Sequence, residues 1–123
     1  MTPFGRKIRE MRSVRGIALK AMAHEIGVSP AYLSALEHGH RSKPTWYLVQ
    51  RIIAFFNVIW DEAEELERLA EISDPRVTLY TGGLSPALTE VANVFARKIA
   101  LLTDDDAEEI MGILKRIDSR RSA

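Results

Sequence analysis

Apolar residues recur about every three or four positions along most of this 123-residue chain, which is the spacing of one helix face. The first such stretch begins at Thr2 and Pro3, which suit the N-cap and the first helical position, and it ends at Gly16. Further helices are expected after four later capping residues, Thr45, Asp61, Ser85 and Thr103. The pattern therefore predicts an all-α fold.

Two short helices joined by a tight turn are predicted within residues 18–37. Gly27 can adopt the positive φ that ends a helix, and Val28 can turn inward as a plug. Ser29 and Pro30 supply an N-cap and a first-turn proline for the second helix. The apolar faces of the two helices consist of Leu19, Met22, Ala23, Ile26, Leu33 and Leu36. This arrangement is typical of a helix-turn-helix, whose second helix is free to enter a groove of DNA.

Residues 4–58 resemble the phage-repressor/Cro (XRE-like) class of helix-turn-helix DNA-binding domains. The matching positions are Ile8, Arg12, Ala23, Gly27, Val28, Leu33, Leu36, Glu37, Gly39 and Pro44. The resemblance implies a small helical bundle in which Arg12 and Glu37 form a structural ion pair. That pair would tie the leading helix to the end of the recognition helix.

The resemblance also implies DNA contacts from the first turns of the recognition helix and from the loop after Glu37. Those turns contain no Gln, Asn or Arg that can make two hydrogen bonds to one base. Leu19 occupies a position where many members carry a phosphate-contacting Gln, and Lys20 can compensate. A modest, A·T-leaning preference that depends on DNA shape is therefore expected. The candidate DNA-binding residues are Lys20, Ser29, Pro30, Ala31, Tyr32, Ser34, His40, Arg41 and Lys43.

The remainder of the chain is predicted to form a C-terminal helical hairpin at residues 84–123. Its apolar stripes are wider than two helices can bury on each other. We therefore predict that a second copy of the chain covers them and that residues 84–123 are a dimerisation unit. The alternative is that the hairpin folds onto the N-terminal domain. The candidate dimerisation residues are Leu88, Val91, Phe95, Ile99, Leu102, Ile110, Leu114 and Ile117.

Between these parts, residues 61–83 are expected to form an acidic helix and a connector with a β-prone run at residues 76–80. The DNA-binding domain is accordingly placed at residues 1–60, with residues 58–60 as a lid on its core. The charge changes at the same point. Residues 1–60 hold nine Lys and Arg against three Asp and Glu, whereas residues 61–123 hold eight against fourteen. A basic half suits a polyanion, and the acidic half is available to a protein partner.

Composition argues against several other classes of protein. The absence of Cys excludes disulfides, cysteine nucleophiles and cysteine metal sites. No apolar run is long enough to suggest a membrane span, and a cytoplasmic location is expected. His38 and His40 lack a third metal ligand at helical spacing, so no metal or cofactor is expected. Acidic groups at Glu64, Glu65 and residues 104–106 have no His or Ser constellation beside them, so we do not expect an enzyme.

The sequence thus favours a cytoplasmic, homodimeric, sequence-preferring transcriptional regulator that binds double-stranded DNA and acts as a repressor. Two alternatives stay open. One is the DNA-binding antitoxin of a toxin–antitoxin pair, in which residues 61–123 cover the toxin. The other is a protein-interaction adaptor with a degenerate helix-turn-helix.

Overall fold

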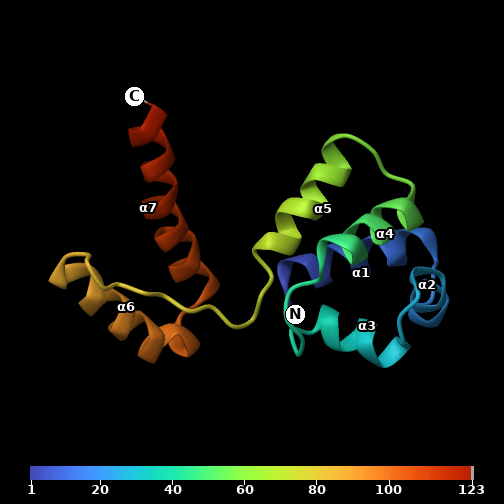
Figure 1. Ribbon diagram of the computed structural model, residues 1–123, viewed down its shortest axis with the longest axis horizontal. Helices are drawn as coiled ribbons and strands as arrows, with labels where there is room; N and C mark the ends of the chain where they lie inside the picture. The colour runs from blue at the N-terminus through green and yellow to red at the C-terminus, as the bar shows by residue number, and fades with distance from the viewer. Residues whose placement is uncertain (123) are drawn as a thin grey trace. The chain divides into compact units, whose positions relative to one another are not determined.

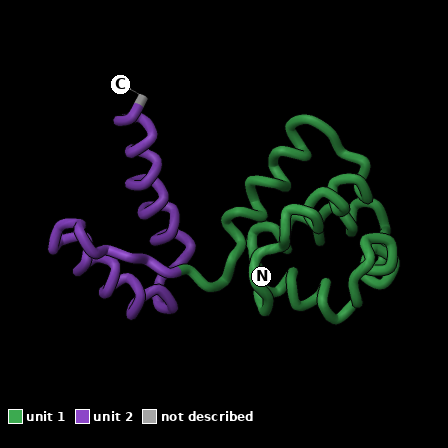
Figure 2. Tube along the Cα trace, viewed as in Figure 1, with its two compact units in different colours: residues 1–77 green, residues 78–123 purple. Residues whose placement is uncertain are grey.

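The computed structural model describes residues 1–122, and it contains seven α-helices and no strand within that range (Figure 1). The prediction of an all-α fold is therefore confirmed, and the β-prone run at residues 76–80 is not part of a strand. The chain divides into two compact units, with unit 1 spanning Met1–Val77 and unit 2 following from Thr78 (Figure 2). Unit 1 contains α1 (Pro3–Arg15), α2 (Leu19–Ile26), α3 (Pro30–Glu37), α4 (Trp46–Phe56) and α5 (Asp61–Glu71).

Side-chain caps set where most of the helices begin. The hydroxyl oxygens of Thr2, Ser29, Thr45 and Ser85 each accept a hydrogen bond from a main-chain N–H in the first turn of the helix that follows. Asp61 was expected to cap α5 in the same way, and this expectation is wrong. Trp60 occupies the N-cap position with φ 52° and makes no side-chain cap bond, which places Asp61 inside the first turn.

The core of unit 1 is built from apolar side chains of all five helices. Phe4, Ile8, Met22, Leu33 and Ile52 are fully buried. Helix α5 packs against α1 and α4, and its Leu66, Leu69 and Ala70 complete the core. Burial of this apolar area is the main stabilising contribution to the unit. The acidic helix is thus part of the first compact unit, while the division of function at residue 60 stays a prediction.

The expected lid at residues 58–60 is only partly formed. Val58 packs on the core, but the side chains of Ile59 and Trp60 are 67% and 79% exposed. Asn57 and Trp60 both have positive φ, which turns the chain sharply between α4 and α5. Because the chain turns here, the side chains of Ile59 and Trp60 do not cover the core. The lid prediction was therefore wrong for these two residues.

Unit 2 consists of α6 (Pro86–Lys98), a 3-10 turn (Ile99–Leu101) and α7 (Asp104–Ser122). Helix α7 begins with a reciprocal cap, because Thr103 Oγ1 accepts from Asp106 N at 3.1 Å while Asp106 Oδ2 accepts from Thr103 N at 3.0 Å. The two helices leave the turn between them in different directions (Figure 1). No described side chain of this unit is buried, and Val91, Ile99 and Leu114 are 61%, 51% and 49% exposed. Five of the eight predicted dimerisation residues are therefore exposed, whereas Phe95, Leu102 and Ile110 are half-buried.

No helix among residues 1–122 is both long and apolar enough to span a membrane.

Candidate nucleic-acid interface

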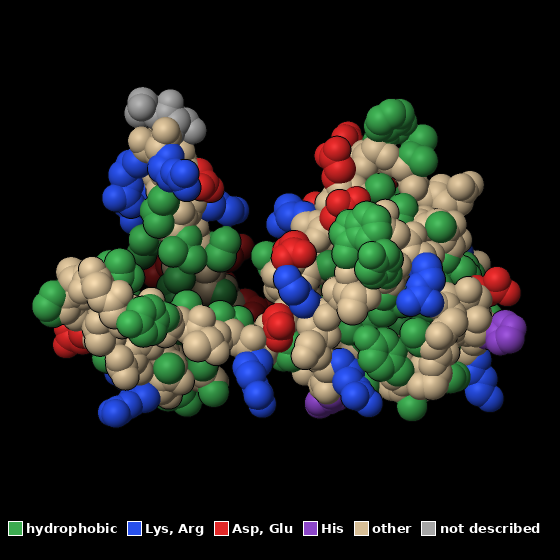
Figure 3. Space-filling view, in the orientation of Figure 1, with side chains coloured by type: hydrophobic (Ala, Val, Ile, Leu, Met, Phe, Trp, Pro, Cys, Tyr) green, Lys and Arg blue, Asp and Glu red, His purple; other side chains and the backbone are tan. Residues whose placement is uncertain are grey.

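Charge is unevenly distributed over the surface of unit 1. Lys, Arg and His side chains lie along its lower edge, at and beside α3, whereas Asp and Glu side chains gather over α5, with some Lys or Arg side chains among them (Figure 3). On the acidic helix, Arg68 donates hydrogen bonds to Glu65 and thereby holds the pKa of that carboxylate below its usual value. The basic edge of the unit therefore includes the helix that was expected to enter DNA.

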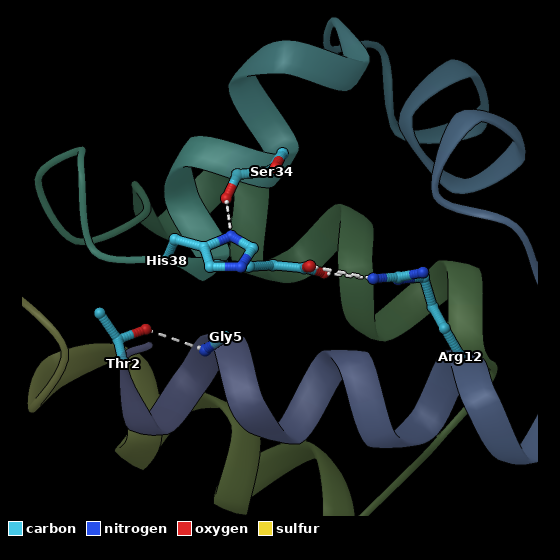
Figure 4. A network of polar contacts seen from close by, with 6 residues as sticks. Thr2, Gly5, Arg12, Ser34 and His38 are labelled. Carbon is cyan, nitrogen blue, oxygen red and sulfur yellow. Dashed lines mark hydrogen bonds and ion pairs between the residues drawn. The ribbon is translucent and has the colours of Figure 1, made fainter.

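An ion pair holds the C-terminal end of α3 against α1. Arg12 reaches from α1 toward that end (Figure 4), and its Nη2 lies 2.9 Å from both carboxylate oxygens of Glu37. The Glu37 side chain is 2% exposed and the Arg12 side chain 11% exposed. Such a pair fixes orientation well, because a buried charge has few alternative partners.

The main chain also joins α1 to α3 at the same place. Thr2 N donates to Glu37 O at 3.1 Å, and Gly5 lies so close to Glu37 that its Cα has no room for a side chain. Ser73, just after α5, braces the start of α1 by accepting a hydrogen bond from Phe4 N at 2.9 Å. The end of α3 is thus held by α1, and the start of α1 is in turn bonded to the segment after α5.

The turn before α3 is fixed by its own geometry and by α4. Gly27 has φ 78°, and Val28 packs against the core. Arg51 of α4 donates from Nη1 to the carbonyl oxygen of Ile26 at 3.0 Å, which satisfies the last turn of α2. The sequence reasoning missed Arg51, although a lone basic residue within the apolar stretch of α4 was a usable signal.

The predicted contact residues of α3 lie on its outer side. Ser29, Pro30 and Ala31 are exposed, and Ser29 Oγ is already an acceptor for Tyr32 N at 3.0 Å. Tyr32 and Ser34 are half-buried. The carbonyl oxygen of Ser34 accepts a hydrogen bond from the His38 ring (Figure 4), with Nδ1 at 2.8 Å. The hydroxyl groups of Ser29, Ser34 and Tyr32 are the polar side-chain groups that the start of α3 can offer to a base edge.

The loop after α3 places basic groups beside this helix. The Arg41 guanidinium lies over the Tyr32 ring, 5.7 Å from its centroid, which joins the loop to α3 in one continuous surface. His40 is exposed in the same loop, and Lys20 is exposed on α2. Lys43 is placed differently from its neighbours, because its Nζ lies 2.7 Å from Glu71 Oε2 of α5. The sequence reasoning did not foresee the Lys43–Glu71 pair.

A family model described as a helix-turn-helix domain matches residues 5–74, which is more than half of the chain. The chain belongs to the helix-turn-helix domain family. This helix-turn-helix protein is 31% identical over 61 residues to the "Uncharacterized HTH-type transcriptional regulator RghRB" of Bacillus subtilis, covering 50% of this chain and 44% of that protein. It is 28% identical over 67 residues to the HTH-type transcriptional regulator SinR of the same species, covering 51% of this chain and 60% of SinR.

The helix-turn-helix protein thus spans about half the length of the curated relatives it matches. Both relatives are named HTH-type transcriptional regulators, and the predicted resemblance to the phage-repressor/Cro class of helix-turn-helix domains is confirmed. No solved structure gives a significant match. Within residues 1–122, no group of three or more His, Cys, Asp or Glu residues is arranged to hold a metal ion.

Proposed function

We propose that this helix-turn-helix protein is a cytoplasmic, homodimeric transcriptional regulator that represses by occupying a site on double-stranded DNA. One observation carries the proposal. Helix α3 is held firmly at its turn and at its C-terminal end, while its outer side stays exposed next to the basic loop that contains Arg41. A rigid, exposed helix beside a cationic loop is what insertion into the major groove requires.

The proposed division of labour follows from the side chains that are present. Arg41 and His40 in the loop, together with Lys20 on α2, contact phosphates and supply most of the affinity. The short side chains of α3 approach the bases closely without bidentate hydrogen bonds, so groove shape supplies much of the preference. Lys43 joins the phosphate contacts only if it leaves Glu71.

The exposed stripes of unit 2 support a dimer. Leu88, Val91, Ile99, Leu114 and Ile117 are each at least 42% exposed, and no other described element of unit 2 covers them. A second copy would remove this apolar area from water. Two recognition helices would then meet half-sites roughly 34 Å apart on one face of the duplex.

Reversing one loop charge tests the DNA-binding role. We expect Arg41→Glu to weaken binding of the full chain to its preferred duplex by about tenfold or more, because a phosphate contact becomes a repulsion. The preferred duplex is first selected from a random pool at two salt concentrations, and affinities are then measured by fluorescence anisotropy. Arg9→Glu on the outer side of α1 is the matched control for net charge. Equal affinities for Arg41→Glu and the unchanged chain would support the adaptor hypothesis instead.

Placing a charge within the apolar stripe of α7 tests the dimer. We expect Leu114→Glu to raise the dimer dissociation constant by about tenfold or more, because the introduced carboxylate would lose its hydration on burial in the interface. Sedimentation equilibrium measures the constant, and circular dichroism checks that the helices persist. Lys115→Glu, at the adjacent position, is the control and should leave the constant nearly unchanged. A dimer that tolerates Leu114→Glu as well as Lys115→Glu would contradict the proposed interface.

A further inference from the structure

A groove of about 440 Å³ lies in unit 1 between the loop after α3 and the segment after α5. One wall contains His40, Arg41 and Ser42, and the other contains Asp74 and Arg76. Arg76 lies beyond the residues matched by the family model, which end at 74. Nothing in the helix-turn-helix resemblance therefore assigns a role to this second wall.

Polar contacts within unit 1 join the two walls of the groove. The Lys43–Glu71 pair joins the loop to the end of α5 at 2.7 Å. Ser73 is buried, donates from Oγ to Leu69 O at 2.6 Å and accepts from Phe4 N at 2.9 Å. Arg76 N then donates to Asp74 Oδ1 at 3.0 Å. These bonds hold the segment that carries Arg76 against the body of unit 1.

The groups that face the groove suit an anion. Two arginines, Arg41 and Arg76, line the groove together with one acidic residue, Asp74, whose Oδ1 already accepts a hydrogen bond from Arg76 N. Among the described residues, the main-chain N–H groups of Arg41 and Ser42 donate to no other group of the chain. Consecutive free N–H groups beside guanidinium groups are a common arrangement for binding phosphate.

We propose that this groove binds a phosphate of the DNA backbone, with Arg76 as a contact residue supplied from beyond the helix-turn-helix core. This inference rests on the proposed function, because it adds a contact to the same interface. Arg41 provides the continuity, since its guanidinium lies over the Tyr32 ring of α3 and the same residue lines the groove. A DNA strand that places one phosphate against Arg41 therefore also runs past the groove. Arg76 would contact a further phosphate of the same strand.

The test compares Arg76→Ala with the unchanged full chain on a duplex that carries the selected site. We expect binding to weaken roughly three- to tenfold on specific and random duplexes alike, and the slope of log affinity against log salt to fall by about 1. Arg76→Lys keeps the charge and should retain the slope. Arg9→Ala, on the outer side of α1, is the control that removes the same charge elsewhere in unit 1.

Three outcomes would overturn the proposal, and they have different meanings. If Arg76→Ala binds like the unchanged chain while Arg41→Glu binds weakly, the DNA-binding function holds and the Arg76 contact is wrong. If Arg41→Glu also has no effect, the proposed function fails and the contact fails with it. If Arg9→Ala lowers the slope as much as Arg76→Ala, the effect belongs to net charge and not to the groove.

A titration with inorganic phosphate alone distinguishes the two sources of the anion. The titration is followed by the NMR chemical shifts of the Arg41, Ser42 and Arg76 amides. We expect no saturable binding at millimolar phosphate, because a free phosphate lacks the additional contacts that a DNA strand makes with the protein. Saturable binding at these amides, with unchanged DNA affinity in Arg76→Ala, would identify a site for a free anion and overturn the proposed DNA contact.

Discussion

Replacing Glu37 with alanine should lower the free energy of unfolding of unit 1 by about 3–5 kcal/mol. The substitution leaves the guanidinium of Arg12 in a site where the residue is 9% exposed and where no other carboxylate of the described residues pairs with it. Arg12 Nε has no hydrogen-bond acceptor among the described residues. The Glu37 carboxylate therefore provides the interaction that offsets the cost of burying the Arg12 charge. A loss of this size is a large part of the stability of a typical domain, about 5–15 kcal/mol. Urea unfolding followed by the NMR signals of core methyl groups measures it.

A double variant keeps this prediction testable even if Glu37→Ala fails to fold. Arg12→Met combined with Glu37→Leu replaces both charges by apolar groups of similar size, which is often neutral or stabilising. We expect the double variant to recover most of the lost free energy, while Arg12→Met alone, which strands the carboxylate, should not. If Glu37→Ala costs less than about 1 kcal/mol, the pair behaves as an exposed one and does not hold α3 in place.

The elements of this fold were largely predictable because their signals are local. A hydroxyl residue before a helix satisfies N–H groups within the next turn, so Thr2, Ser29, Thr45 and Ser85 mark the helix starts in the sequence itself. Gly27 marks a turn for a similar reason, since φ 78° costs a glycine little. The prediction that Asp61 is the N-cap of α5 was wrong because acidic residues are favoured both at the N-cap and within the first turn. The N-cap is Trp60, one position earlier.

Apart from the Arg12–Glu37 pair, which the family resemblance implied, the contacts around α3 were harder to predict because they join distant parts of the chain. Arg51 and Ile26, or Lys43 and Glu71, are separated by 25 and 28 residues, and no local pattern links them. Arg76 lies in a segment that the sequence indicates only as a connector, and its place beside Arg41 follows from how α5 ends. Ile59 and Trp60 were expected in a lid because they are apolar, but the turn between α4 and α5 leaves them exposed.

Gly5 is the clearest case of a residue whose importance is visible only in three dimensions. In the sequence, a glycine inside a helix is a weak point, and alanine would be expected to stabilise α1 by about 1 kcal/mol. In the structure, a Cβ on residue 5 would lie 2.5 Å from Glu37 Cα and 2.7 Å from Glu37 C. These are backbone atoms, so α1 and α3 must move apart to accept it.

We therefore expect Gly5→Ala to destabilise unit 1 by about 2 kcal/mol, because overpacking of about 3 kcal/mol outweighs the gain in helix propensity of about 1 kcal/mol. Separating the helices also stretches the hydrogen bond from Thr2 N to Glu37 O, now 3.1 Å, at the end of α3. Urea unfolding measures the loss, and DNA affinity should fall with it, since the recognition helix depends on this contact for its position.

Gly112 of α7 is the matched control for this change. A Cβ added there meets nothing within 4 Å, so Gly112→Ala should raise the helix content and stability of unit 2 by about 1 kcal/mol. The same substitution in two helices of one chain is thus expected to act in opposite directions. If Gly5→Ala also stabilises the protein, α1 and α3 are free to separate without loss, and the close approach at Glu37 does not position the recognition helix.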